Sequence, residues 1–171
     1  NIELSEENYY QLIAAKTAEL FASACKVGGI AAKANKQQLE YLYNFGMNFG
    51  MVFQIIDDIL DYFSEDNKIG KKIGDDFFEG KVTLPIILLL RKASDKEKKD
   101  IVSYFSSGYN RKKIDLDNIL SLLEKYKIKD LTIEKASHFV KSGKQNIESL
   151  PDSSINKMMS NSIEQSINRI F

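Results

Sequence analysis

Four polar residues interrupt an otherwise apolar stretch of the sequence, FQIIDDILDYF (53–63). They are Gln54, Asp57, Asp58 and Asp61. If the stretch is helical, each residue is rotated by about 100° from the last, and the four then share a sector about 100° wide. The isoleucines and the leucine between them fall on the opposite side. The pattern predicts an amphipathic helix whose polar face carries three carboxylates and one amide.

Two interpretations of this face compete. The first is a solvated acidic surface, which usually mixes both signs of charge, but no Lys or Arg occurs between Lys36 and Lys68. The second is a binding site for a divalent cation, because clustered carboxylates repel one another unless a cation balances them. Magnesium prefers oxygen ligands and often links one or two carboxylates to a substrate phosphate. We therefore favour a site for Mg²⁺ and a phosphate.

Cations that could complete such a site lie on either side of this helix. The segment SEDNKIGKKIGDDFFEGK (64–81) interleaves glycines with lysines, namely Lys68, Lys71, Lys72 and Lys81. Lys16 and Thr17 form a polar pair, expected to be buried, in AAKTAELF (14–21). Each feature alone has a plain alternative: a hydrated loop, and a lysine whose stem lies along apolar surface. Together with the aspartates they predict binding and ionisation of a diphosphate.

The elements that would position these residues are all helical, since helical spacing is common and strand-like alternation is scarce. A first helix, capped by Ser5, is expected to run to about Val27 and stop at Gly28-Gly29. The aspartates belong to a second, long helix over about 36–63, in which Gly46 and Gly50 indicate close helix packing.

Later helices have clear start signals. Thr83 is expected to cap a short apolar helix with Pro85 in its first turn, and Ser94 to cap an amphipathic helix over 94–105. The remaining segments continue the helical bundle as scaffold. His138, the only histidine, has no triad or metal partner in its neighbourhood and is expected on a helix surface or in the core.

The totals bound the classes of function. The 171 residues suit one all-α domain over 1–171, or part of one, and the net charge of zero gives no field for nucleic acid. Cys25 is the only cysteine, so no disulfide framework is expected, and no apolar run approaches the ~20 residues of a membrane span. We expect a cytoplasmic protein and leave peripheral membrane attachment open. Because the chain begins with Asn1 close to a helix start, we expect a fragment.

Three blocks of the sequence together resemble the trans-prenyl diphosphate synthases, and most of all their long-chain octaprenyl and solanesyl members. The blocks are YYQLIAAKTAELFASACKVGG (9–29), FGMVFQIIDDILDYF (49–63) and GKKIGDDFFEGKVTLPIILLL (70–90). The resemblance covers nearly the whole chain, but only the C-terminal half to two-thirds of such an enzyme. It implies an all-α isoprenoid synthase fold, usually a homodimer.

The resemblance also implies roles. Asp57 and Asp61 would contribute to Mg²⁺ binding, Asp58 would help to organise that side, and Asp76 would join the metal shell through water. The residues that would contact the diphosphate or the reacting region are Lys16, Thr17, Gln54, Lys71 and Lys81. The substrates would be an allylic diphosphate and isopentenyl diphosphate, and the product a quinone side chain.

The chain departs from the family pattern in one respect. The first aspartate-rich motif and the upstream blocks that hold isopentenyl diphosphate do not occur, and they would precede Asn1. An alternative is therefore a non-catalytic or regulatory subunit that pairs with an active synthase. A terpene cyclase or squalene-type synthase is a weaker third reading, because such enzymes are not expected to carry the 70–90 block.

Overall fold

The computed structural model describes residues 4–63, 73–151 and 153–169, and every regular element within these ranges is a helix. This confirms the predicted all-α class. The chain divides into two compact units. We call residues up to Tyr9 with Asp57–Thr132 the aspartate unit, and Tyr10–Ile56 with Ile133–Phe171 the long-helix unit. That 1–171 belongs to a single domain stays a prediction.

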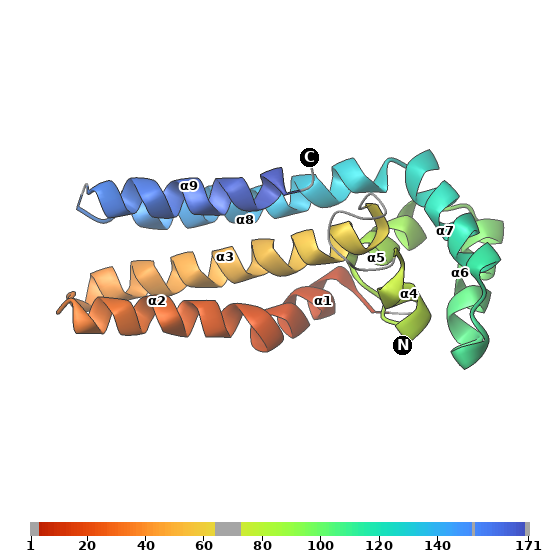
Figure 1. Cartoon of the computed structure of the whole chain (residues 1–171), viewed down its shortest axis with the longest axis horizontal. Coiled ribbons are helices and arrows are strands. Elements are labelled where there is room, and N and C mark those ends of the chain that lie inside the picture. Colours follow the sequence, from red (N-terminus) through yellow and green to blue (C-terminus); the bar gives the residue numbers. More distant parts are fainter. Residues whose placement is uncertain (1–3, 64–72, 152, 170–171) are drawn as a thin grey trace. The chain divides into compact units, whose positions relative to one another are not determined.

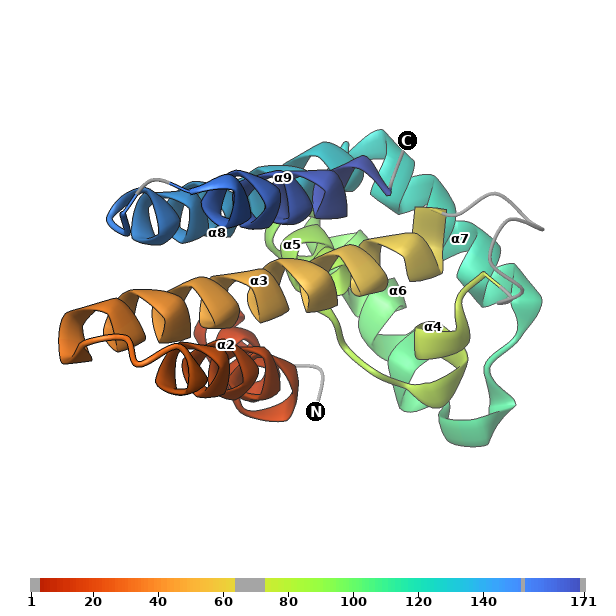
Figure 2. The same cartoon turned by 60° about the vertical axis from the view of Figure 1, so that its left-hand side comes forward.

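The elements that contribute to the long-helix unit are α1 (Glu6–Ile13), a π-helical turn η1 (Ala14–Ala18), α2 (Glu19–Ala31), α3 (Lys36–Phe63), α8 (Ile128–Glu148) and α9 (Ser154–Asn168). Within this unit α2 lies alongside α3, and α8 alongside α9 (Figures 1 and 2). The long helix predicted over 36–63 is confirmed as α3.

Gly46 and Gly50 allow α3 to approach its neighbour closely, as predicted. A Cβ atom on Gly46 would lie 2.5 Å from the backbone oxygen of Phe21, and one on Gly50 would lie 2.4 Å from the Cα of Ala18. Both contacts are with backbone atoms, which cannot turn aside as a side chain can. The two glycines therefore bring the backbone of α3 against η1 and α2.

The predicted end of the first helix at Gly28-Gly29 is wrong, because α2 continues to Ala31. Gly29 is buried, and a Cβ there would lie within 2.8 Å of the side chains of both Leu42 and Leu39, so this glycine serves packing. Beyond the helix, Lys33 takes a positive φ of 58°. Ser5 does accept a hydrogen bond from the backbone N–H of Asn8 (3.1 Å), as a cap should.

The aspartate unit contains α4 (Asp75–Glu79), α5 (Leu84–Lys92), α6 (Asp95–Ser106), a short 3₁₀ turn η2 (Gly108–Asn110) and α7 (Lys113–Lys125). Its core is formed around α5, whose residues 84–89 are all buried. Phe77 of α4 meets Phe105 of α6 edge to face, with ring centroids 5.3 Å apart. The helix α4 was not predicted, since 64–81 reads as a polar loop.

Helix starts in this unit follow the sequence signals in part. Ser94 caps α6, and Glu97 completes a capping box with it. Thr83 stands at the N-cap of α5, as expected, but its hydroxyl makes no capping hydrogen bond. No described helix combines the length and the apolar composition needed to cross a bilayer.

Candidate functional site

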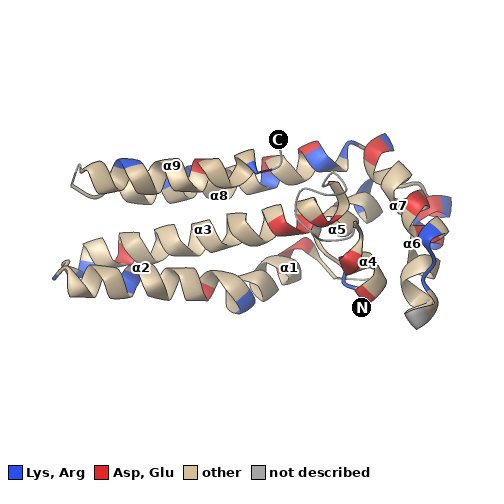
Figure 3. Ribbon diagram, in the orientation of Figure 1, with Lys and Arg blue, Asp and Glu red and all other residues tan. Residues whose placement is uncertain are grey.

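The aspartates predicted to form one face lie at the C-terminal end of α3, where they form a red band in Figure 3. Asp58 is 3% exposed and Asp61 is 9% exposed, while Asp57 is half-buried. The interpretation as a solvated acidic surface is therefore wrong. Ile55, Ile56 and Ile59 are fully buried and hold this part of the helix in the core.

Asp58 is bound by a tyrosine from the start of the chain. The hydroxyl of Tyr9, in α1, donates to Oδ2 of Asp58 across 2.6 Å. Tyr9 is only 1% exposed, so both partners are inside the aspartate unit. A hydrogen bond to an ionised acceptor is short and strong, and a buried carboxylate needs such a donor.

Asp61 binds the segment that follows α3. Its Oδ2 accepts the backbone N–H of Asp76 (3.2 Å), and its backbone oxygen accepts the N–H of Gly74 (2.8 Å). Asp76 in turn accepts from Lys81 Nζ at 3.2 Å. Three of the predicted site residues are thus connected in one sequence of contacts inside the aspartate unit.

Lys81 stays charged in this arrangement. Its ammonium group lies 2.5 Å from Glu79 Oε2, and the hydrogen bonds to Glu79 first and then to Asp76 raise the pKa of Lys81. The side chain is half exposed, so water screens these ion pairs. Lys81 therefore offers a cation that is already shared between two carboxylates.

Tyr62 is buried beside the aspartates. Its hydroxyl and that of Thr83 have no partner of hydrogen-bonding geometry among the described residues. Burial, followed by the negative charges of Asp61, Asp76 and Asp58, raises the pKa of Tyr62 well above its ordinary value, and the nearby Thr83 hydroxyl opposes this only in part. The phenol is therefore a neutral group within the aspartate unit.

The remaining described site residues belong to the long-helix unit. The hydroxyl of Thr17 donates to Oε1 of Gln54 across 2.8 Å, which links η1 to α3. Thr17 is half-buried, but Lys16 is exposed, so the prediction of a buried pair is wrong for the lysine. The ammonium group keeps its hydration because Lys16 stands on an outward-facing position of η1.

The π-helical turn η1 contains both Lys16 and Thr17. Such turns insert one extra residue into a helix and are frequent at functional sites. Ala18, at its end, is fully buried and meets Gly50 of α3. The turn thus contains the two residues predicted to contact the diphosphate, and the sequence pattern did not predict the turn itself.

Other predicted residues add less. Lys71, with Lys68 and Lys72 of the same segment, falls outside the described residues. Within the described residues, no three His, Cys, Asp or Glu side chains converge as a group that could hold a metal ion. His138 is exposed on α8, which fits the expected surface histidine.

Comparison with known proteins identifies the family. The model described as Polyprenyl synthetase matches residues 1–123. The chain belongs to the polyprenyl synthetase family. A short chain isoprenyl diphosphate synthase of Methanothermobacter thermautotrophicus is 31% identical over 152 residues, which are 89% of this chain and 46% of that relative. An octaprenyl diphosphate synthase of Haemophilus influenzae is 32% identical over 151 residues, 88% of this chain and 45% of that relative.

Solved polyprenyl synthetase structures share the fold. A decaprenyl diphosphate synthase of Rhodobacter capsulatus has a TM-score of 0.90 and 30% identity, over 100% of this chain and 52% of that one. A polyprenyl synthase of Caulobacter crescentus, complexed with calcium and isoprenyl diphosphate, has a TM-score of 0.93 and 29% identity over the same shares. The chain spans about half the length of the relatives it matches.

Sequence reasoning missed two residues that lie beside the predicted aspartates, Tyr9 and Tyr62. Both are tyrosines in apolar surroundings, and such residues usually belong to the core. Tyr9 opens the quoted 9–29 block and Tyr62 follows Asp61 directly, so their positions were visible, but only the fold shows what their hydroxyls meet.

Proposed function

We propose that this chain forms the part of a polyprenyl diphosphate synthase that binds Mg²⁺ and an allylic diphosphate. The observation that supports this most strongly is the aspartate face of α3, where Asp57 and Asp61 stand four residues apart in the apolar, largely buried C-terminal part of the helix. Carboxylates in such a setting need a cation or hydrogen-bond donors to offset their desolvation. The relative solved with calcium and isoprenyl diphosphate supports this choice of ligands.

The donor set fits magnesium rather than a metal held by protein alone. Mg²⁺ keeps several waters and takes one or two carboxylates together with substrate phosphates, so the absence of a converging group of three among the described residues is compatible with it. Asp57 and Asp61 would hold it, because they lie on one side of α3 a turn apart. Asp76, 16% exposed, would reach it through water. Bound Mg²⁺ would neutralise charge on the diphosphate oxygens.

The chain's own residues would then serve three tasks. Lys16, Lys71 and Lys81 would bind the diphosphate and stabilise the negative charge that develops as it leaves. Thr17 and Gln54, already hydrogen-bonded to each other, would present a fixed polar edge to the substrate. The apolar residues around them would keep water from the reacting carbon.

The reaction proposed is an electrophilic condensation. The allylic carbon–oxygen bond breaks, and both of its electrons go to pyrophosphate. The double bond of isopentenyl diphosphate then attacks the allylic carbon, and a proton leaves to the departing pyrophosphate as the new double bond forms. Repetition of this step would lengthen the polyprenyl product, which we assign to quinone side chains. We further propose that the enzyme is a homodimer and works in the cytoplasm.

The test measures product formation by the complete gene product that contains this chain. With Mg²⁺, an allylic diphosphate and labelled isopentenyl diphosphate, we expect labelled polyprenyl diphosphate. Asp57→Asn should lower kcat roughly a hundredfold or more, as loss of a transition-state contact does. Asp95→Asn is the control, since its carboxylate is 98% exposed in α6. Equal turnover by Asp57→Asn and the wild type would overturn the assignment.

A second candidate is a non-catalytic subunit that assembles with an active synthase. Its support is one relative, named heptaprenyl diphosphate synthase component 2, which is 30% identical over 103 residues. This candidate predicts no turnover by the complete gene product alone, and turnover once a second synthase chain is added. Turnover by the product on its own would exclude it.

A further inference from the structure

The three aspartates of α3 differ in what they contact. Asp58 accepts the Tyr9 hydroxyl at 2.6 Å inside the aspartate unit, and Asp61 accepts the backbone N–H of Asp76 at 3.2 Å. Asp57 is the most exposed of the three. The motif therefore contains one carboxylate that is committed to a buried tyrosine, next to two that lie a turn apart on one side of the helix.

The Tyr9–Asp58 contact is built into the fold. The two residues are 49 positions apart in the sequence, and both side chains are almost fully buried. Tyr9 follows Glu6 in α1, and Glu6 forms an ion pair with Arg91 of α5 in the same unit. The start of α1 is thus joined to the rest of the aspartate unit by an ion pair and by a hydrogen bond.

We propose that Tyr9 is a positioning residue: its hydroxyl holds the Asp58 carboxylate inside the aspartate unit, so that Asp57 and Asp61 form the cation-binding pair. This inference rests on the proposed function. It specifies the organising role that the resemblance implies for Asp58: the residue would set the orientation of α3 and would not itself bind the cation. Removal of a residue that hydrogen-bonds and orients metal-binding residues commonly lowers metal affinity 10–100-fold.

The reason for this arrangement is electrostatic. Without the Tyr9 hydroxyl, the buried Asp58 carboxylate loses a strong donor. It would then lower its free energy by turning toward the polar face of α3. There it would disturb the spacing of Asp57 and Asp61. A neutral amide at position 58 has no such demand, so removing the charge should offset the loss of the tyrosine hydroxyl.

The experiment measures Mg²⁺ affinity by calorimetry in the presence of inorganic pyrophosphate, and thermal unfolding in parallel. Tyr9→Phe should weaken Mg²⁺ binding about tenfold or more. Tyr9→Phe/Asp58→Asn should return to within about threefold of the wild type, since the second change removes the buried carboxylate that had lost a donor. The control is Tyr43→Phe, which removes another tyrosine–carboxylate hydrogen bond, from Tyr43 to Glu19 at 2.7 Å on the exposed surface.

Comparison of the aspartates themselves decides the outcome even if Tyr9→Phe fails to fold. Asp58→Asn, whose amide oxygen can still accept from Tyr9, should bind Mg²⁺ within about threefold of the wild type, whereas Asp57→Asn should lose about tenfold or more. Equal losses in the two variants would overturn the inference, as would a folded Tyr9→Phe whose melting temperature falls with unchanged affinity. A wild type that binds no Mg²⁺ with pyrophosphate would instead overturn the proposed function.

Discussion

At the scale of single residues, the hydroxyl of Tyr62 stands in a buried and acidic environment. It is buried beside Asp61, Asp76 and Asp58, and it has no hydrogen-bond partner among the described residues. Burial of a hydroxyl without a partner costs free energy, so this group adds little to the stability of the fold. The Thr83 hydroxyl is also buried without a partner among the described residues, since it does not cap α5.

We predict that Tyr62→Phe changes the free energy of unfolding by less than about 1 kcal/mol at pH 7, because it removes a hydroxyl that is not paired. The difference in the free energy of unfolding between Tyr62→Phe and the wild type should grow above pH 10. The raised pKa of Tyr62 means that its contribution is complete below its ordinary pKa of 10.0 and is lost as the pH rises toward its higher folded value. Urea unfolding at pH 7 to 11 should show a shallower decline for Tyr62→Phe, and parallel curves would contradict this.

At the scale of the element, α3 shows how much could be predicted. Its bounds and its aspartate face follow from spacing, and Gly46 and Gly50 correctly indicated close packing. Its partner helix was predicted less well. The π-helical turn and the continuation of α2 through Gly28-Gly29 depend on contacts with α3. The local sequence of the partner helix does not show those contacts. The same holds for α4, which depends on the aromatic contacts of Phe77.

The glycines provide a matched test of that packing. Gly50→Ala should destabilise the protein by about 1–3 kcal/mol, because its Cβ would stand 2.4 Å from the Cα of Ala18. Gly28→Ala, with nothing within 4 Å of its Cβ, should be neutral or stabilising by up to about 1 kcal/mol through helix propensity. Urea unfolding measures both, and equal effects of the two variants would contradict the close approach of α3 to η1.

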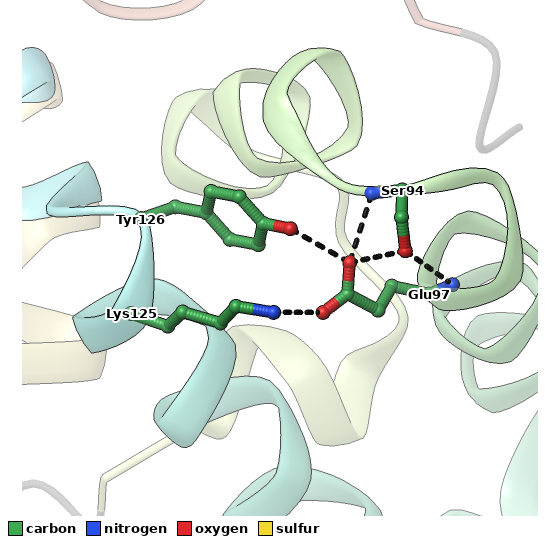
Figure 4. Close-up of polar contacts among 4 residues, drawn as sticks. All are labelled: Ser94, Glu97, Lys125 and Tyr126. Carbon is green, nitrogen blue, oxygen red and sulfur yellow. Dashed lines mark hydrogen bonds and ion pairs between the residues drawn. The ribbon is translucent and has the colours of Figure 1, made fainter.

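A second inter-element contact joins α6 to α7 around Glu97 (Figure 4). Its carboxylate accepts from Lys125 (2.7 Å) and Tyr126 (2.7 Å), and from the backbone N–H of Ser94 (2.8 Å). The hydrogen bond from Lys125, then that from Ser94, then that from Tyr126 lower the pKa of Glu97 well below its ordinary value of 4.5. One side chain thus completes a helix cap and binds the next helix.

Glu97→Gln should therefore reduce stability at pH 7 but not in strong acid. Because the folded pKa is depressed, the stability that Glu97 contributes is present above pH 4.5 and is lost as the pH falls toward the lower folded value. Unfolding by urea at pH 7, 4 and 3 should show that the difference in the free energy of unfolding between variant and wild type shrinks as the pH falls. Asp95→Asn controls for the loss of one exposed charge in the same turn. A difference that stays constant with pH would contradict the prediction.

At the scale of the whole molecule, each compact unit contains some of the predicted site residues. The aspartate unit holds Asp57, Asp58, Asp61, Asp76 and Lys81, and the long-helix unit holds Lys16, Thr17 and Gln54. Helix α3 contributes to both, since Gln54 precedes Asp57 by three residues in one continuous helix. A ligand that binds the folded chain and not the unfolded chain stabilises the folded state.

This linkage leads to a prediction for ligand binding and removal. Mg²⁺ and pyrophosphate together, at about a hundred times their dissociation constant, should add about 2.7 kcal/mol to the free energy of unfolding. For a chain of this size that raises the melting temperature by roughly 5–10 °C. Addition of a chelator should reverse the shift, and Asp57→Asn should reduce it, whereas Asp95→Asn should leave it as in the wild type. A shift of the same size in Asp57→Asn would mean that the ligands bind away from the aspartate face of α3.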